Sequence, residues 1–508
     1  MFEGREEALQ TRVLRGLSWK FASQLILQGT RIALALILAR LLTPHEYGLA
    51  GMVLVFASFV LIFSDFGLGA ALVQREEVTE TDCSTVFWAT VTAGLVFAGV
   101  GFAVAGPVAS FYRAPDVKPL FSALALSFVL SGLGTVQRSL LMRSMAFRKL
   151  ELRAIVATLT SAALAISLAV AGFGAWAIIA QVLTMDAVST LILWTASPWR
   201  PRFVFSWASL KRFGGFGLNS FGTRLLSDVN ENADTLLIGR FTTPSLVGAY
   251  SLAYNVTLLP ANRIVSPIQQ VLFPAFSRIQ RDSKRVGEAW IQANVLIAAV
   301  SLPALAGLIA LAPDFVPLVL GRRWDRAIPV VQILAWVGVV ESLQRLNWVV
   351  LQARDRTQTL LRFSVVAVGA NLAAFAIGLH WGIVGVAACY AISMTVFLPV
   401  YMTITARVVE TSGAQAARRL RGVVEAATTM ALALVGGRLM LAHEGVAASV
   451  RLPVLIVCGF LIFVGIGAWR APEVTSVIRS VVRARRSRVR PTPAPDAAIA
   501  AHEPGGLA

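Results

Sequence analysis

The stretch STVFWATVTAGLVFAGVGFAVAG (residues 84–106) contains no charged side chain. It is long enough to cross the hydrocarbon core of a bilayer as a helix, which takes about 20 apolar residues. Similar stretches recur along the chain, and of its 508 residues 56% are hydrophobic and only 14% are charged. An average soluble protein carries about 25% charged residues. The composition therefore excludes a water-soluble enzyme, a disordered protein and a secreted disulfide scaffold, and it predicts an all-α polytopic membrane protein.

A window of that length predicts about fourteen transmembrane helices, of which the seventh and eighth are the least hydrophobic. They lie near residues 18–39, 47–65, 84–106, 119–137, 152–172, 174–196, 214–236, 247–272, 289–311, 327–349, 359–379, 382–405, 423–442 and 452–469. The N-terminus lacks the pattern of a cleavable signal, because charged residues continue to Arg15. We therefore expect the first apolar stretch to be a retained helix.

The basic residues are distributed unevenly between the connecting segments. Most of the 45 Lys and Arg residues lie in the segments that face the cytoplasm if the N-terminus is cytoplasmic. This positive-inside pattern requires an even number of spans and places both termini in the cytoplasm. The formal net charge of +18 thus reflects membrane topology, and it needs no nucleic acid partner as an explanation.

The chain resembles itself at an offset of about 200 residues. ARLLTPHEYG (39–48) aligns without gaps with GRFTTPSLVG (239–248), so that an Arg, a Thr, a Pro and a Gly coincide. Because each half would contain six spans, the two halves enter the membrane in the same direction, as parallel repeats about an axis along the membrane normal.

The resulting division has six parts. They are a cytoplasmic N-terminus (1–16), a first six-helix bundle (17–198), a cytoplasmic linker (199–213), a second six-helix bundle (214–408), two extra helices (409–470) and a basic, then disordered, cytoplasmic tail (471–508).

Polar residues line one face of the helix that opens each half. The first helix carries them four and three residues apart, at Gln24, Gln28 and Arg31. The matching face of the seventh helix carries Arg224, Asp228 and Glu231, with Asn219 nearby. Two such stripes would be costly in lipid, which predicts a shared hydrophilic cavity where the arginines bind an anionic group and the acids balance or gate it. In the alternative interpretation, Arg224 and Asp228 only form a local ion pair.

Two further positions are candidates for gating or a secondary role. Arg263 lies in a helix interrupted by Pro260, Pro267 and Pro274, which we expect to break or bend it. Arg263 could equally extend to the cytoplasmic interface. Glu341 and Arg345 are spaced to form an ion pair near the cytoplasmic end of the tenth helix.

Motifs for catalysis or cofactor binding are missing. The sequence has no phosphate-binding loop, no HExxH and no paired carboxylates of the D-x-D type, and its three cysteines form no CxxC pair. We therefore expect no metal, no cofactor and no enzymatic activity.

Several segments resemble the polysaccharide transporter family, the Wzx-type oligosaccharide flippases of the multidrug/oligosaccharidyl-lipid/polysaccharide exporter superfamily. They include GLSWKFASQLILQG, FSDFGLGAALVQR (63–75), GFGAWAIIAQ (172–181), DTLLIGRF (234–241) and VLFPAFSRIQ (271–280). The resemblance implies two six-helix bundles in a V around a central, often cationic cavity. It also implies a multi-pass protein of the bacterial inner membrane that moves a polyprenyl-pyrophosphate-linked oligosaccharide outward for lipopolysaccharide, capsule or exopolysaccharide synthesis. Arg31 and Arg224 are the candidate pyrophosphate ligands by position.

Three other functions stay open. A cation-coupled drug antiporter of the same superfamily would use a buried acid, for which Asp228, Glu231 and Asp234 are available. A polysaccharide polymerase would need a large outer loop, and every predicted outer loop is short. A structural scaffold would not need two matched polar stripes. Family members usually act beside a polymerase and chain-length or export proteins, which the resemblance therefore adds as partners to the lipid-linked substrate and the membrane lipids.

Overall fold

The computed structural model describes residues 23–470, except residues 25, 58–66, 214–231, 280–281 and 355; most side chains between 259 and 275, and that of residue 357, also lie outside the description. The described residues form helices and no strand. A first group comprises α2 (Pro44–Leu54), α4 (Leu68–Gln74), α5 (Glu80–Tyr112), α6 (Val117–Arg143), α7 (Phe147–Val170) and α8 (Trp176–Ala196). A second group comprises α10 (Pro244–Arg278), α11 (Ser283–Phe315), η1 (Val316–Leu320), η2 (Arg322–Ala327), α12 (Ile328–Ala353), α13 (Thr357–Gly378), η3 (Leu379–Trp381), α14 (Gly382–Val408), α15 (Gly413–His443) and α16 (Ala448–Arg470). Residues 26–41, 207–213 and 232–241 are also helical.

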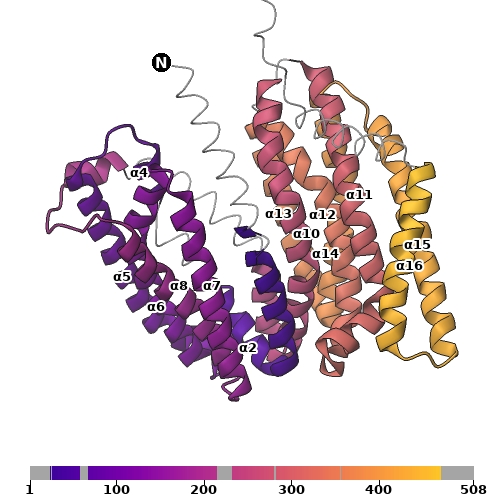
Figure 1. Ribbon diagram of the computed structural model, residues 1–508, viewed down its shortest axis with the longest axis horizontal. Coiled ribbons are helices and arrows are strands. Elements are labelled where there is room, and N and C mark those ends of the chain that lie inside the picture. The colour runs from indigo at the N-terminus through magenta and orange to yellow at the C-terminus, as the bar shows by residue number, and fades with distance from the viewer. Residues whose placement is uncertain are drawn as a thin grey trace, which may run out of the picture.

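The two groups lie side by side and come together at one end. In Figure 1, α4–α8 occupy the left of the molecule and α10–α16 the right, with α2 between them at the lower end. α2 packs against α10 of the second group and against α6 and α8 of its own. We call this the outer end, because it holds the connections that the basic-residue pattern assigns to the outside. The opposite end, the inner end, holds the connection between α6 and α7 and the one between α14 and α15.

Most of the described helices have the length and composition of membrane spans. Within the described residues, nine segments are long and apolar enough to cross a membrane, and one of them, Gln358–Val408, contains both α13 and α14. α10 is not among the nine, in line with the low hydrophobicity of the predicted eighth span. The predicted first, second and seventh spans each include residues outside the description.

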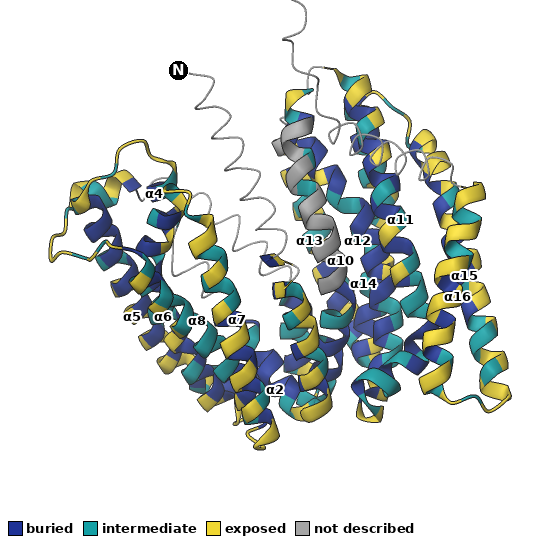
Figure 2. Cartoon of the chain, viewed as in Figure 1, coloured by how far each residue is buried: buried dark blue, intermediate teal, exposed yellow. Residues whose placement is uncertain are grey.

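The buried side chains show where the two groups are joined. The largest cluster of buried apolar residues is continuous across both groups and includes Leu42, Tyr112, Tyr250 and Trp324. Figure 2 shows buried segments gathered around α2 at the outer end. At the inner end, each group has a separate cluster: one around Phe213 in the first group and one around Trp290 in the second. The packing therefore ties the groups together at the outer end.

Local sequence signals explain where the helices begin. Thr43 caps α2: its hydroxyl accepts a hydrogen bond from the Glu46 amide, and the Glu46 carboxylate accepts one from the Thr43 amide at 2.8 Å. Pro44 follows at the first helical position, where a missing amide hydrogen costs nothing. The same capping box opens α5 at Thr79 and Asp82.

The expected break at the prolines of the eighth span is absent. α10 runs as one continuous helix from Pro244 to Arg278, through Pro260, Pro267 and Pro274. A proline removes one backbone hydrogen bond from a helix, but membrane helices tolerate this loss where their neighbours satisfy the freed carbonyl. A break at these prolines is therefore excluded, and the other predicted outcome, a bend of the continuous helix, stays a prediction.

A largely buried ion pair connects α16, the last of the two C-terminal helices, to the second group. The Arg451 guanidinium at the start of α16 donates to both oxygens of Asp314 near the end of α11, with Nε 2.9 Å from Oδ2. Their side chains are only 12% and 6% exposed. Such a two-point contact fixes orientation as well as position. It anchors α16, while α15 packs along α11.

The predicted linker 199–213 is held on the first group. The Trp88 indole donates to the carbonyl of Arg202 at 2.9 Å, and Arg212 pairs with the buried Asp82. Phe213 is fully buried, with the guanidinium carbons of Arg75 and Arg212 lying 5.0 and 5.2 Å from its ring centre. This end of the linker is therefore part of the first group's inner end.

Candidate functional site: the outer seam and the polar stripe

Two glycines that the internal alignment pairs bring the backbones of the two groups into contact. An added Cβ on Gly48 would lie 1.7 Å from the carbonyl oxygen of Pro244, and one on Gly248 would lie 2.0 Å from the carbonyl oxygen of Pro44. The contact is therefore reciprocal, as equivalent segments related by a two-fold axis would make it. Small residues allow membrane helices to approach at backbone distance. We call these four residues, Pro44, Gly48, Pro244 and Gly248, the outer seam.

A second pair from the same alignment flanks the outer seam. The Arg40 guanidinium donates to the carbonyl of Val319 at 2.7 Å and to that of Leu318, in the turn that follows α11. The Arg240 guanidinium lies over the ring of Phe111, 5.6 Å from its centre, near the end of α5. Each arginine thus reaches from one group to the end of a long helix in the other. Because α5 and α11 are the third and ninth predicted spans, these contacts follow the repeat.

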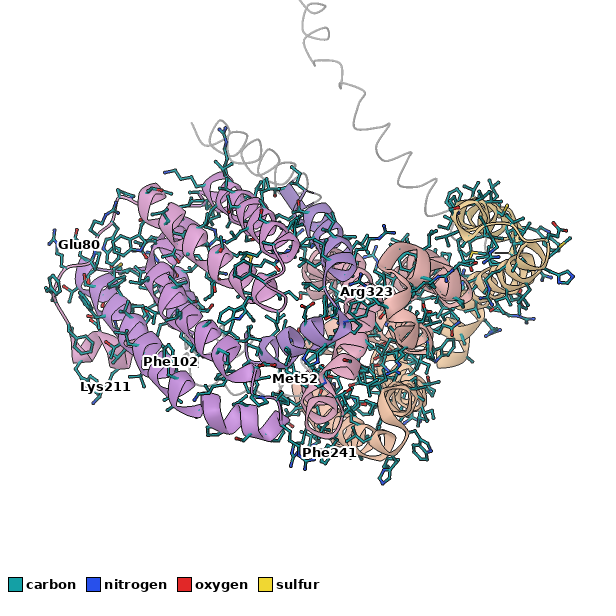
Figure 3. The ribbon with its side chains drawn as sticks, turned by 90° about the horizontal axis from the view of Figure 1, so that it is seen from below. Met52, Glu80, Phe102, Lys211, Phe241 and Arg323 are labelled. Carbon is teal, nitrogen blue, oxygen red and sulfur yellow. The ribbon has the colours of Figure 1, made fainter. Side chains whose placement is uncertain are left out.

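Tightly packed aromatic residues also join the two groups at the outer end. The Trp324 indole donates to the carbonyl of Ala39 at 2.7 Å, and the Trp324 ring meets Tyr47 edge to face at 5.6 Å. Tyr47 also accepts a hydrogen bond from the Asn255 amide across the seam at 3.1 Å. Figure 3 looks at this end and shows Met52 where the two groups meet. Since these contacts leave little space, the outer end is closed in this conformation.

The polar stripe of the first helix faces less packed surroundings. Gln24 and Arg31 are exposed and Gln28 is half-buried, whereas Leu27 and Leu34, which border the polar stripe on one side, are buried. The structure thus places the three polar residues on a side of the helix that the apolar core does not cover. This geometry is compatible with a cavity wall.

The matching stripe of the seventh helix cannot be compared. Four of its predicted residues lie outside the described part of the chain: Asn219, Arg224, Asp228 and Glu231. The pairing of the two stripes across a cavity therefore stays a prediction. Arg263 lies within α10, but its side chain is outside the description as well.

The predicted ion pair in the tenth helix is present. Arg345 donates to the Glu341 carboxylate one turn away on α12, and their side chains are 28% and 20% exposed. The carbonyl of Arg345 accepts a hydrogen bond from the Gln269 amide of α10 at 2.9 Å. Arg345 therefore has an internal counter-charge, which favours a structural or gating role over direct binding of an anion.

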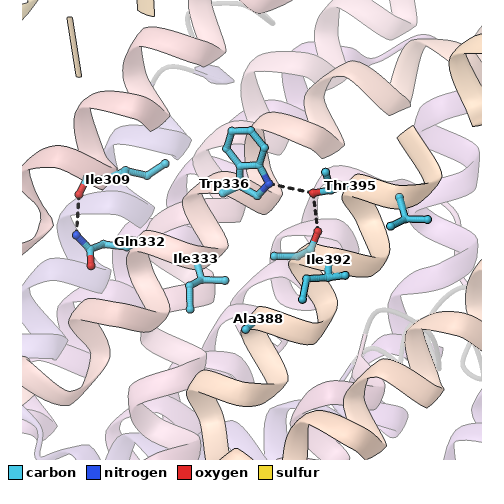
Figure 4. Close-up of a pocket in the computed structure, with 9 residues that line it drawn as sticks. Ile309, Gln332, Ile333, Trp336, Ala388, Ile392 and Thr395 are labelled. Atoms are coloured by element: carbon cyan, nitrogen blue, oxygen red, sulfur yellow. Dashed lines mark hydrogen bonds between the residues drawn. The ribbon is translucent and has the colours of Figure 1, made fainter. Parts of the chain in front are cut away.

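A large pocket in the second group lacks the chemistry for an anionic head group. It has a volume of about 690 Å³ and lies between α11, α12 and α14. Figure 4 shows Gln332 donating to the carbonyl of Ile309 at 2.9 Å and Trp336 donating to the Thr395 hydroxyl at 3.0 Å. No charged residue lines it. A pyrophosphate would find no counter-charge there.

Comparison with known proteins decides the family. Residues 37–329 match the family described as polysaccharide biosynthesis protein. The chain belongs to this family. The resemblance found in the sequence is thereby confirmed.

Relatives of the chain support the assignment to this family. The chain is 29% identical to the lipopolysaccharide biosynthesis protein WzxC of Escherichia coli strain K12, over 73% of this chain and 76% of WzxC. It is 26% identical to the teichuronic acid biosynthesis protein TuaB of Bacillus subtilis strain 168, over 90% of this chain and 95% of TuaB. A solved structure of the lipid II flippase MurJ, in an inward closed conformation, superposes with a TM-score of 0.74 at 14% identity, over 90% of this chain and all of that chain. The chain thus has the MurJ fold.

The family match covers some candidate residues and leaves others out. It begins after Gln24, Gln28 and Arg31 and ends before Glu341 and Arg345, but it contains the whole outer seam. Among the described residues, no group of three or more His, Cys, Asp or Glu side chains is placed to hold a metal ion.

Two kinds of residue lie outside the sequence-based predictions. The internal alignment pairs Gly48 with Gly248 but does not predict that the two segments touch, because a contact 200 positions apart has no local signal. Asp186, a half-buried carboxylate in the middle of α8, is not among the predicted site residues. A single acid in an apolar run, LTMDAVST, is a recognisable signal for a functional position. Asp234, by contrast, is buried and already accepts hydrogen bonds from the Tyr250 hydroxyl at 2.7 Å and the Thr235 amide at 2.6 Å.

Proposed function

We propose that this chain is a flippase that moves a polyprenyl-pyrophosphate-linked oligosaccharide from the inner to the outer leaflet of the bacterial plasma membrane by alternating access. It would have fourteen spans with both termini in the cytoplasm, and its two six-helix repeats would form a V around a central cavity. The observation that carries the proposal is the reciprocal seam between Gly48 and Gly248. Two pseudo-symmetric groups whose described residues pack together at the outer end can rock about that contact, which is the motion alternating access requires.

The relatives support the class of substrate. WzxC and TuaB are named for the biosynthesis of lipopolysaccharide and teichuronic acid, both surface glycans, and MurJ is a lipid II flippase. In our proposal the pyrophosphate head enters from the cytoplasm and meets Arg31 and Arg224, with Gln24, Gln28, Asn219, Asp228 and Glu231 completing the wall. The polyprenyl tail stays in the lipid. No covalent bond changes, so the chain acts as a transporter beside a polymerase and export proteins.

Deleting the chain from a strain that depends on it tests this function. We expect complete lipid-linked repeat units to accumulate on the inner leaflet and surface polysaccharide to disappear, because the lipid-linked head group cannot cross the hydrocarbon core unaided. Mass spectrometry of the extracted lipid-linked intermediates would measure this. Single repeat units displayed on the outer surface would instead indicate a polymerase.

The second candidate is a cation-coupled small-molecule antiporter. The half-buried Asp186 in α8 and the buried Asp234 in the helical segment 232–241 are the observation that favours it. Efflux of small organic cations driven by an ion gradient, measured with purified protein in vesicles, would support it. The flippase proposal expects no such efflux.

A further inference from the structure

A pocket at the outer end of the first group is unrelated to the polar stripe. Its volume is about 310 Å³, at the lower end of the usual 300–1,000 Å³ for small-molecule sites. The start of α2, the start of α6 and the turn between α7 and α8 form its walls. The repeat segment LTPHEYG and the family-like segment GFGAW thus meet in one place although about 130 residues separate them.

Some residues that line this pocket stabilise the fold. One oxygen of Glu46 caps α2 through Thr43, and the other lies so close to the turn that an added Cβ on Gly174 would be 2.7 Å from it. Gly172 and Gly174 both have left-handed backbone conformations, with φ of +82° and +55°, which side chains rarely adopt. These two glycines bring the turn against the carboxylate and give the pocket its shape.

Other side chains that line the pocket have no structural role among the described contacts. Phe173 and Trp176 are 56% and 41% exposed, although they are large apolar residues. Asp116 precedes α6 but makes no side-chain capping bond, and both it and His45 are exposed. Below them, the buried Leu49 and Leu120 close the floor. An aromatic wall therefore stands beside Asp116 and His45, for which no side-chain hydrogen bond is described, and beside the one Glu46 oxygen that does not cap α2.

This combination suits a sugar ring and disfavours a phosphate. Ionised carboxylates only accept hydrogen bonds, and sugar hydroxyls can donate them. The C–H face of a pyranose is apolar enough to lie on an aromatic ring, as other apolar groups do. Two carboxylates repel a pyrophosphate, so the pocket would take the glycan part of a lipid-linked oligosaccharide and reject its anionic head.

We propose that this pocket binds one neutral sugar residue at the outer end, with Trp176 as the stacking surface and Asp116 and Glu46 as acceptors. The inference rests on the proposed function in one respect: a glycan delivered to the outer leaflet would meet this pocket as it leaves. The pocket would then hold the sugar end of the substrate on the side of release.

Ligand-observed saturation-transfer NMR on the full-length protein in nanodiscs tests the site. The probes are D-glucose, D-galactose, L-rhamnose and N-acetyl-D-glucosamine, with sodium pyrophosphate as the competitor. We expect saturable binding of at least one sugar, strongest at its C–H protons and unaffected by pyrophosphate. Trp176→Leu and Asp116→Ala should each raise the Kd about tenfold.

The chain offers a matched control. Trp381 is 69% exposed in the corresponding turn of the second group and lines neither of the two pockets described above. Trp381→Leu should leave sugar binding unchanged, and both variants should elute as monodisperse protein. Absence of saturable binding for all four sugars, equal loss in Trp381→Leu, or competition by pyrophosphate would each overturn the proposal.

Failure of the sugar-binding proposal can be distinguished from failure of the proposed flippase function. If lipid-linked units accumulate on deletion but no sugar binds, the flippase proposal stands and the pocket is an interfacial aromatic cluster of the kind common in membrane proteins. If sugar binds but deletion causes no accumulation, the pocket stands and the flippase proposal fails.

Discussion

Gly48→Val is expected to abolish surface polysaccharide export, with a reduction of at least about tenfold. A Cβ on residue 48 would lie 1.7 Å from the Pro244 carbonyl oxygen, and both atoms belong to packed helices that cannot yield locally. Overpacking of this kind typically costs about 1–3 kcal/mol, and a loss of about 2 kcal/mol in the closed form alone changes its ratio to the open form about thirtyfold. The outer end should therefore stay open.

A labelling experiment measures the opening itself. Ser251 packs against Gly51 next to the outer seam, because an added Cβ on Gly51 would be 2.9 Å from its hydroxyl oxygen. In a background without the native cysteines, a cysteine introduced as Ser251→Cys should be protected from an impermeant maleimide added outside. Adding Gly48→Val should make it reactive.

The repeat supplies the controls for this prediction. Gly248→Val should have the same effect, since its Cβ would lie 2.0 Å from the Pro44 carbonyl oxygen. Gly99→Val and Gly369→Val should export normally, because no atom lies within 4 Å of their added Cβ positions. Normal export by Gly48→Val at normal protein levels would show that the seam does not have to close.

Arg31→Ala is expected to reduce export by at least about tenfold while the protein level stays normal. If Arg31 contacts the pyrophosphate, the substitution removes a charge-assisted hydrogen bond, which is about twice as strong as a bond between neutral groups. Arg31→Lys separates two possibilities: a mild effect means that a point charge suffices, and a severe one means that two-point phosphate geometry matters. Export can be measured as surface polysaccharide in a complemented deletion strain.

Arg224→Ala should behave in the same way as Arg31→Ala if both stripes line one cavity. Arg418, an exposed arginine at the inner end of α15, is the matched control, and Arg418→Ala should export normally. Undiminished export by both Arg31→Ala and Arg224→Ala would remove the polar stripes from the binding site and leave the seam account intact.

The limits of the helices could be predicted from the sequence because apolar length is a local property. The predicted spans 174–196 and 382–405 correspond closely to α8 (Trp176–Ala196) and α14 (Gly382–Val408). The division into two halves could also be predicted, because Thr-Pro and a later Gly recur at the same spacing in residues 39–48 and 239–248. Of the break or bend expected at the prolines of α10, the break is absent, since proline acts locally whereas continuity of the helix depends on what its neighbours can satisfy.

The contacts that close the outer end could not be predicted. Arg40 lies 279 positions before its partner Val319, and nothing in ARLLTPHEYG indicates that this arginine bonds carbonyls at the end of a distant helix. The same holds for Trp324 and Ala39. Sequence patterns report which face of a helix is polar or small, but the partner of that face depends on the packing of the whole chain.

Transport of the lipid-linked repeat unit in reconstituted vesicles tests the central proposal most directly. Vesicles containing the purified chain and repeat units extracted from the deletion strain would be treated with an impermeant sugar oxidant. The flippase account predicts that the protected inner-leaflet fraction is consumed over time, that vesicles without protein keep it, and that Gly48→Val slows its loss. A protected fraction that stays constant in the presence of folded wild-type protein would contradict the account.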